Sequence, residues 1–197
     1  RVMRYAIIWA AILLLCGFQA SELRWPSPTT ITLRFMAYGM PEGMHEAAIV
    51  AAAMWRSPSL EIRIVQEGYN GKTNGKIIFG GSVVLGHGIM GTTHRMGVQS
   101  RQLMGCDVTV SASDVPWHTG QEPPPPDHAD VITDFAHEFG HCIGLLHEDG
   151  ATPPALMRTH IPYGEYHRTL PADDRSARDR LFPPAQYGGL LGCGKRF

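Results

Sequence analysis

The chain is organised around one segment: His137-Glu138-Phe139-Gly140-His141-Cys142-Ile143-Gly144-Leu145-Leu146-His147. On a helix, His137 and His141 are about one turn apart and share a face, so both imidazoles can bind one metal ion. Gly144 permits the left-handed turn that ends many helices, and this turn brings His147 back as a third ligand. Three nitrogen ligands leave one tetrahedral position open for water, which is typical of a catalytic zinc ion and not of a structural one.

Glu138 follows the first histidine and is offset from it around the helix, as expected of a general base beside the metal. Apolar residues recur at helical spacing through this region and predict a buried stripe: Val131, Ile132, Phe135, Phe139, Cys142 and Ile143. Asp130 and Asp134 lie near the expected helix start, where acidic side chains are favoured. The alternative is a polar helix face with two satisfied histidines, but the glycine and third histidine at fixed offsets favour the metal site.

The motif resembles that of the metzincins, a class of zinc metallopeptidases, and within them the matrixins, which are matrix-metalloproteinase-like. Ala155-Leu156-Met157 resembles their methionine turn, which implies that Met157 packs as a hydrophobic floor under the ligands. The segment 170–174, Leu-Pro-Ala-Asp-Asp, resembles the opening of their last helix. The resemblance covers roughly Thr30 to Phe182 and implies a zincin-like catalytic domain over residues 30–183. The implied fold is α+β, with a mixed twisted sheet of about four to five strands, a packing helix, an active-site helix and a C-terminal helix.

The resemblance further implies a zinc-dependent endopeptidase that cleaves peptide or protein substrates with one catalytic zinc and Glu138 as general base. Two other functions remain open: a non-catalytic module that binds zinc and a partner, and a hydrolase of cell-wall peptide amides. The intact Glu138 argues against the first of these. Neither a structural zinc nor calcium is predicted, because four histidines are scattered without the matching aspartates and are interpreted as surface residues: His87, His94, His118 and His128.

Alternating apolar residues predict strands at 31–35 and 60–65, with shorter strands at 76–79 and 107–111. An alanine-rich segment, 44–55, predicts the packing helix. In the family, the segment around 88–93 forms the upper rim of the cleft and pairs with an extended substrate, although an ordinary glycine-rich loop is the alternative here. The substrate-binding candidates are Ile89, Met90, Gly91 and Thr92 in this rim, with Ile161, Pro162 and Tyr163 as a wall for the residue after the cut.

The chain has 197 residues and a formal net charge of -1, which suits one domain and gives no sign of nucleic-acid binding. Residues 1–20 contain an apolar run too short to span a bilayer, and they predict a signal peptide or an N-terminal anchor. A lipid on Cys16 is a third possibility and, with the anchor, the only expected link to a membrane. We therefore expect a secreted or cell-envelope protein, monomeric, with a glycine-rich tail over 184–197.

Export implies an oxidising compartment, in which disulfides persist. Removal of the signal segment would leave three cysteines, Cys106, Cys142 and Cys193, so one pair and one leftover thiol are expected. We favour Cys106–Cys142, which would tie a strand to the active-site helix.

Overall fold

The computed structural model describes residues 23–80, 90–97, 101–111 and 115–184. The elements in these ranges are β1 (Thr29–Phe35), α1 (Met44–Met54), β2 (Leu60–Gln66), β3 (Gly75–Gly80), β4 (Gly91–Gly97), β5 (Leu103–Ser111), β6 (Trp117–His118), β7 (Ala129–Asp130), α3 (Val131–Ile143) and α4 (Ala172–Leu181). The described part of the chain is therefore an α+β protein with three helices and a mixed sheet of five strands, which confirms the expected class.

The five-stranded sheet has the order β2-β1-β3-β5-β4. β2, β1, β3 and β5 run parallel to one another. β4, at the edge of the sheet, runs antiparallel to β5. β1 lies inside the sheet, and Ile31 and Leu33 on it are completely buried. All four strands predicted from alternation are present, and β5 begins four residues earlier than expected, at Leu103. The expected rim becomes the edge strand β4, which starts at Gly91.

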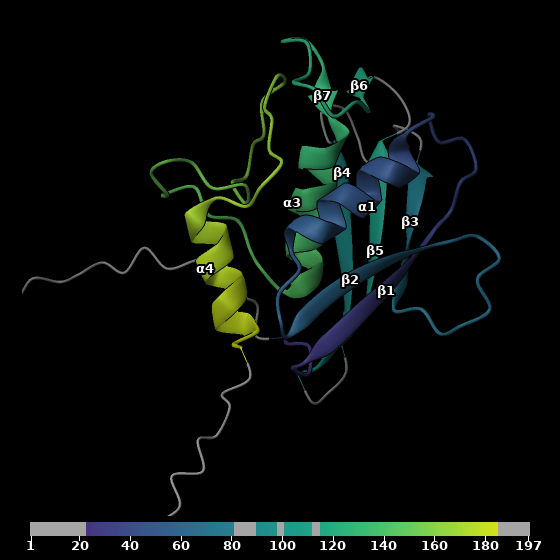
Figure 1. Ribbon diagram of the computed structural model, residues 1–197, viewed down its shortest axis with the longest axis vertical. Helices are drawn as coiled ribbons and strands as arrows, with labels where there is room; N and C mark the ends of the chain where they lie inside the picture. Colours follow the sequence, from purple (N-terminus) through teal and green to yellow (C-terminus); the bar gives the residue numbers. More distant parts are fainter. Residues whose placement is uncertain (1–22, 81–89, 98–100, 112–114, 185–197) are drawn as a thin grey trace, which may run out of the picture.

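Helices α1 and α3 pack against each other over one face of the sheet, and α4 lies on the other side of α3 (Figure 1). Small side chains let α1 approach α3 closely: Ala47, Ala48, Ala51 and Ala52 are all buried. The indole of Trp55, at the end of α1, donates a 2.7 Å hydrogen bond to the carbonyl of Ala136. The expected stripe of α3 is buried throughout, as predicted.

Both ends of α3 are capped by the residues that the sequence suggests. Asp130 is the N-cap and accepts from the Thr133 amide at 2.9 Å, while Arg168 bonds both of its carboxylate oxygens at 2.6 and 2.8 Å. Gly144 ends the helix at a φ of 110°, a left-handed conformation that favours glycine. The first and last residues of α3 are therefore set by Asp130 and Gly144 at its ends.

A disulfide joins Cys106 of β5 to Cys142 of α3, the pairing favoured from the sequence. It ties the sheet to the last turn of α3. The predicted leader over 1–20, Cys193 and almost all of the predicted tail lie outside the described residues. Within the described ranges, no helix is long and apolar enough to cross a membrane.

The scattered histidines keep contact with solvent where the structure describes them. His94 is exposed, and His118 and His128 are partly exposed, with a ring nitrogen near the carbonyl of Glu122 and the carboxylate of Asp127 respectively. His87 lies outside the described residues.

Candidate metal centre

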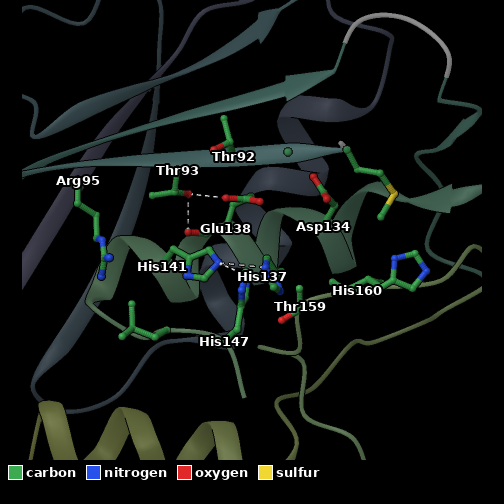
Figure 2. Close-up of a pocket in the computed structure, with 14 residues that line it drawn as sticks. Thr92, Thr93, Arg95, Asp134, His137, Glu138, His141, His147, Thr159 and His160 are labelled. Carbon is green, nitrogen blue, oxygen red and sulfur yellow. Dashed lines mark hydrogen bonds between the residues drawn. The ribbon is translucent and has the colours of Figure 1, made fainter. Parts of the chain in front are cut away.

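The three predicted ligand histidines meet at one point. The Nε2 atom of His141 lies 3.1 Å from Nε2 of His137 and 3.1 Å from Nε2 of His147. Among the described residues, these three form the one group of histidine, cysteine or acidic side chains whose ligand atoms lie close enough together to hold a metal ion. The last turn of α3 and the Gly144 cap bring His147 to the other two, as the spacing predicts (Figure 2).

The other ring nitrogens determine which form the imidazoles take. Nδ1 of His137 lies 2.9 Å from the carbonyl of Leu156, and Nδ1 of His141 lies 2.9 Å from the carbonyl of Leu145. A carbonyl only accepts, so each Nδ1 carries the proton and each Nε2 presents a lone pair. Two lone pairs that face each other at hydrogen-bond distance need a cation between them.

A proton is a poor candidate for that cation. Burial, followed by the charges of His141 and His147, lowers the pKa of His137 to about 3. Burial also lowers the pKa of His141 to about 4. Both rings are therefore neutral near pH 7, which is the form that binds metal. The donor set fits a divalent metal ion.

The loop that contains Leu156 and Met157 lies beneath the imidazoles and orients the ring of His137. Its carbonyl at Leu156 holds the His137 ring, and the Met157 carbonyl accepts a 2.7 Å bond from the Glu148 amide. Asp174, at the start of α4, accepts from the amides of Leu156 and Met157 at 2.8 and 3.1 Å. The segment that resembles the opening of the family's last helix thus supports the metal ligands through the loop.

Met157 is completely buried directly under α3. A Cβ added to Gly140 would collide with the sulfur of Met157 and would come within 2.9 Å of the Trp55 ring. Gly140, in the middle of the motif, therefore leaves room for the methionine floor. The thioether of Met157 fills space next to the helix and needs no hydrogen bond there.

Glu138 lies between the imidazoles and the edge strand β4. The hydroxyl of Thr93 donates a 2.6 Å hydrogen bond to Oε2 of Glu138 and lies 3.0 Å from the Glu138 carbonyl (Figure 2). The side chain is only 4% exposed. Burial raises the pKa of Glu138 to about 7, although the Thr93 hydrogen bond acts in the opposite direction. A carboxyl group with this pKa can both take up and release a proton near neutral pH.

A cavity of about 770 Å³ opens over the metal centre. Its lining consists of Met90, Gly91, Thr92, Thr93, Arg95, Asp134, His137, Glu138, His141, Leu146, His147, Thr159, His160 and Ile161. Three of the rim candidates are in this set, and Ile89 lies outside the described residues. Of the predicted wall segment, Ile161 lines the cavity, whereas Pro162 and Tyr163 are exposed and do not. The wall on this side is formed by Ile161 together with Thr159 and His160.

Five lining residues outside the motif were not singled out for the site from the sequence: Thr93, Arg95, Asp134, Thr159 and His160. Asp134 was interpreted as a favourable charge at the helix start, but it is only 4% exposed. Burial, and then the charges of Glu138 and Asp130, raise the pKa of the Asp134 carboxyl well above its usual value. The signal available in the sequence was its spacing: Asp134 precedes Glu138 by four residues and so shares its helix face.

A scan against protein-family models found no match, and a search of curated proteins found no significant match. The class that the fold and the site define is therefore stated at the level of geometry: an α+β protein with three converging imidazoles in a cleft.

Proposed function

We propose that this protein is a zinc-dependent endopeptidase of the metzincin type, similar to the matrixins. One observation carries the proposal: the neutral imidazoles of His137 and His141 point their unprotonated Nε2 atoms at each other, with His147 beside them. Nitrogen ligands at bonds of about 2.0–2.1 Å around a tetrahedral zinc lie about 3.3 Å apart, close to the spacing here. When bound, zinc supplies a Lewis acid that polarises a carbonyl group and lowers the pKa of a coordinated water.

Glu138 supplies the proton transfers in the proposed reaction. Thr93 occupies Oε2, so Oε1 is the oxygen that exchanges the proton. The carboxylate takes a proton from the attacking water and later gives it to the nitrogen of the leaving amine. A pKa of about 7 suits both steps near neutral pH.

The edge strand β4 supports a polypeptide substrate. Gly91, Thr92 and Thr93 border the cleft, and within the described ranges no strand pairs with the far side of β4. An extended peptide can pair with such an edge through its backbone, which would lay the peptide across the metal centre. The disulfide and the apolar segment near the N-terminus support export, and with it an extracellular or cell-envelope substrate.

The test compares the purified chain with two variants. We expect one zinc per chain and cleavage of casein that a hydroxamate inhibits. Glu138→Gln should retain zinc and lose about 10²–10⁴-fold in kcat, since it can no longer accept the proton. His141→Ala should lose zinc as well as activity.

The matched control is His94→Ala, because His94 is exposed on β4 and does not line the cavity. It should retain both zinc and activity. Zinc binding without cleavage of any peptide would favour the non-catalytic module instead, and a Glu138→Gln variant as active as the parent would remove the assigned role.

A further inference from the structure

Asp134 presents a carboxyl group to the cleft without a structural partner. Its Oδ2 atom is buried and has no hydrogen-bond partner in the described part of the chain. The other two buried aspartates among the described residues, Asp130 and Asp174, each accept hydrogen bonds from backbone amides. An unpartnered buried carboxyl is costly, and here it contributes nothing visible to the fold. Its position suggests instead that a ligand supplies the missing donor.

Gly91 of β4 lies directly against Asp134, and both residues line the cavity. A Cβ at Gly91 would lie 2.9 Å from Asp134 Oδ2 and 3.0 Å from Glu138 Oε1, so both oxygens border the same point. Because Gly91 has no side chain, β4 passes over the two carboxyl groups without filling that space. A substrate strand paired with β4 would place its side chains beside the space next to Gly91.

The chemistry of Glu138 identifies which substrate residue comes closest. Glu138 gives its proton to the leaving nitrogen, so the residue immediately after the cut lies next to Glu138. Asp134 precedes Glu138 by four residues, which is about 6 Å along the axis of α3. A long side chain on that substrate residue can extend past Glu138 to the Asp134 carboxyl group.

The charges of the cleft favour a cationic side chain. Arg95 is the one lysine or arginine among the lining residues, and Asp134 and Arg95 lie at opposite ends of the site (Figure 2). The charge of Arg95 contributes to the lowered pKa of His141, and Arg95 is not among the charges that shift the pKa of Asp134. Among the described lining residues, no lysine or arginine therefore lies on the Asp134 side of the cleft. An ammonium or guanidinium group would supply both donors and charge.

We propose that Asp134 is a specificity-determining residue that binds a lysine or arginine side chain on the residue immediately after the cut. This inference rests on the proposed peptidase function. Asp134 contacts the substrate side chain and takes no part in bond cleavage.

The experiment uses peptides that differ only at the residue after the cut: Lys, Arg, norleucine or Glu. The parent should prefer Lys and Arg over norleucine by about 10–100-fold in kcat/KM, the range of one charge-assisted hydrogen bond. Asp134→Asn should lose most of this preference, and Asp134→Leu should favour norleucine. The control Asp173→Asn removes the same charge from an exposed position on α4 and should keep the preference of the parent.

A binding measurement separates this inference from the proposed function. Fluorescence anisotropy with Glu138→Gln reports affinity for the same peptides without cleavage. Tighter binding of the Lys peptide that disappears in the Glu138→Gln, Asp134→Asn double variant supports the role of Asp134, even if the parent cleaves nothing. Cleavage by the parent with no preference for Lys or Arg would overturn the inference and leave the peptidase proposal intact. A preference that survives Asp134→Asn would also overturn it.

Discussion

Asp174 below the metal centre and Asp134 beside it are both buried aspartates, and their surroundings are opposite. Asp174 is completely buried, and its two oxygens accept from the amides of Leu156 and Met157. Asp134 is almost as buried, but its Oδ2 accepts from no described residue. The same side chain thus holds a loop in one place and is left unsatisfied in the other.

The contrast extends to the regions around these residues. In the floor, which we define as Leu156, Met157 and Asp174, polar atoms bond one another and the His137 ring. At the two ends of the cleft, Asp134 Oδ2 and Arg95 Nη1 are both buried without a partner in the described chain. Native proteins satisfy nearly all buried polar groups, so unsatisfied ones need an explanation. The polar atoms of the floor are satisfied within the protein, whereas the ends of the cleft hold buried polar atoms that a bound ligand would satisfy.

Asparagine at each position gives the sharpest test of this difference. In Asp174→Asn, an amide group replaces one acceptor and faces a backbone N–H, so we expect a loss of about 2–4 kcal/mol in the free energy of unfolding. Zinc affinity should fall about 10–100-fold as well, because the loop that orients His137 is loosened. Asp134→Asn should stay within about 1 kcal/mol of the parent or exceed it, since no hydrogen bond is lost. Urea denaturation at fixed free zinc measures both variants, and equal losses would remove the distinction.

Two glycines allow a smaller test of the same comparison. Gly140→Ala places a methyl group against the buried Met157 and Trp55 side chains, and overpacking of this kind costs about 1–3 kcal/mol. Gly91→Ala places its methyl group against Asp134 and Glu138 at the half-buried edge strand. We expect less than about 1 kcal/mol of destabilisation there, because side-chain ends can move, but about a 10-fold loss of kcat/KM. Thermal unfolding and peptide cleavage separate the two outcomes, and a Gly91→Ala variant with unchanged kcat/KM would mean that substrate does not approach there.

The floor and the ends of the cleft also differ in how far the sequence could predict them. The metal centre depends on local spacing: two histidines one turn apart, a glycine cap and a third histidine lie within 11 residues. These features are determined by the helix itself and need little knowledge of the rest of the chain. The α+β class, by contrast, was implied by the family resemblance, and Cys106–Cys142 was a choice among the three cysteines that follow the leader.

The rim depends on contacts between distant segments. The Thr93 bond to Glu138 and the passage of Gly91 over Asp134 are set by the register of β4 on β5, which no short pattern specifies. Asp134 could be assigned to the same helix face as Glu138, but its burial depends on where β4 lies. Pro162 and Tyr163 were chosen from an irregular loop, where no periodicity indicates which side chains face inward.

The pH dependence of stability gives the finest test of the two aspartates. The pKa of Asp134 is raised in the folded protein above its usual value of 3.8, so the folded state holds this proton more tightly than the unfolded chain does. The contribution of this protonated carboxyl group to stability is fully present below pH 3.8 and is lost as the pH rises through the pKa of Asp134 in the folded protein. Relative to the parent, metal-free Asp134→Asn should therefore gain stability as the pH rises above about 4, by about 1.4 kcal/mol for each unit of elevation. Urea denaturation in EDTA across this range measures the difference, and a difference that stays constant would show that Asp134 ionises in the folded protein as freely as in the unfolded chain.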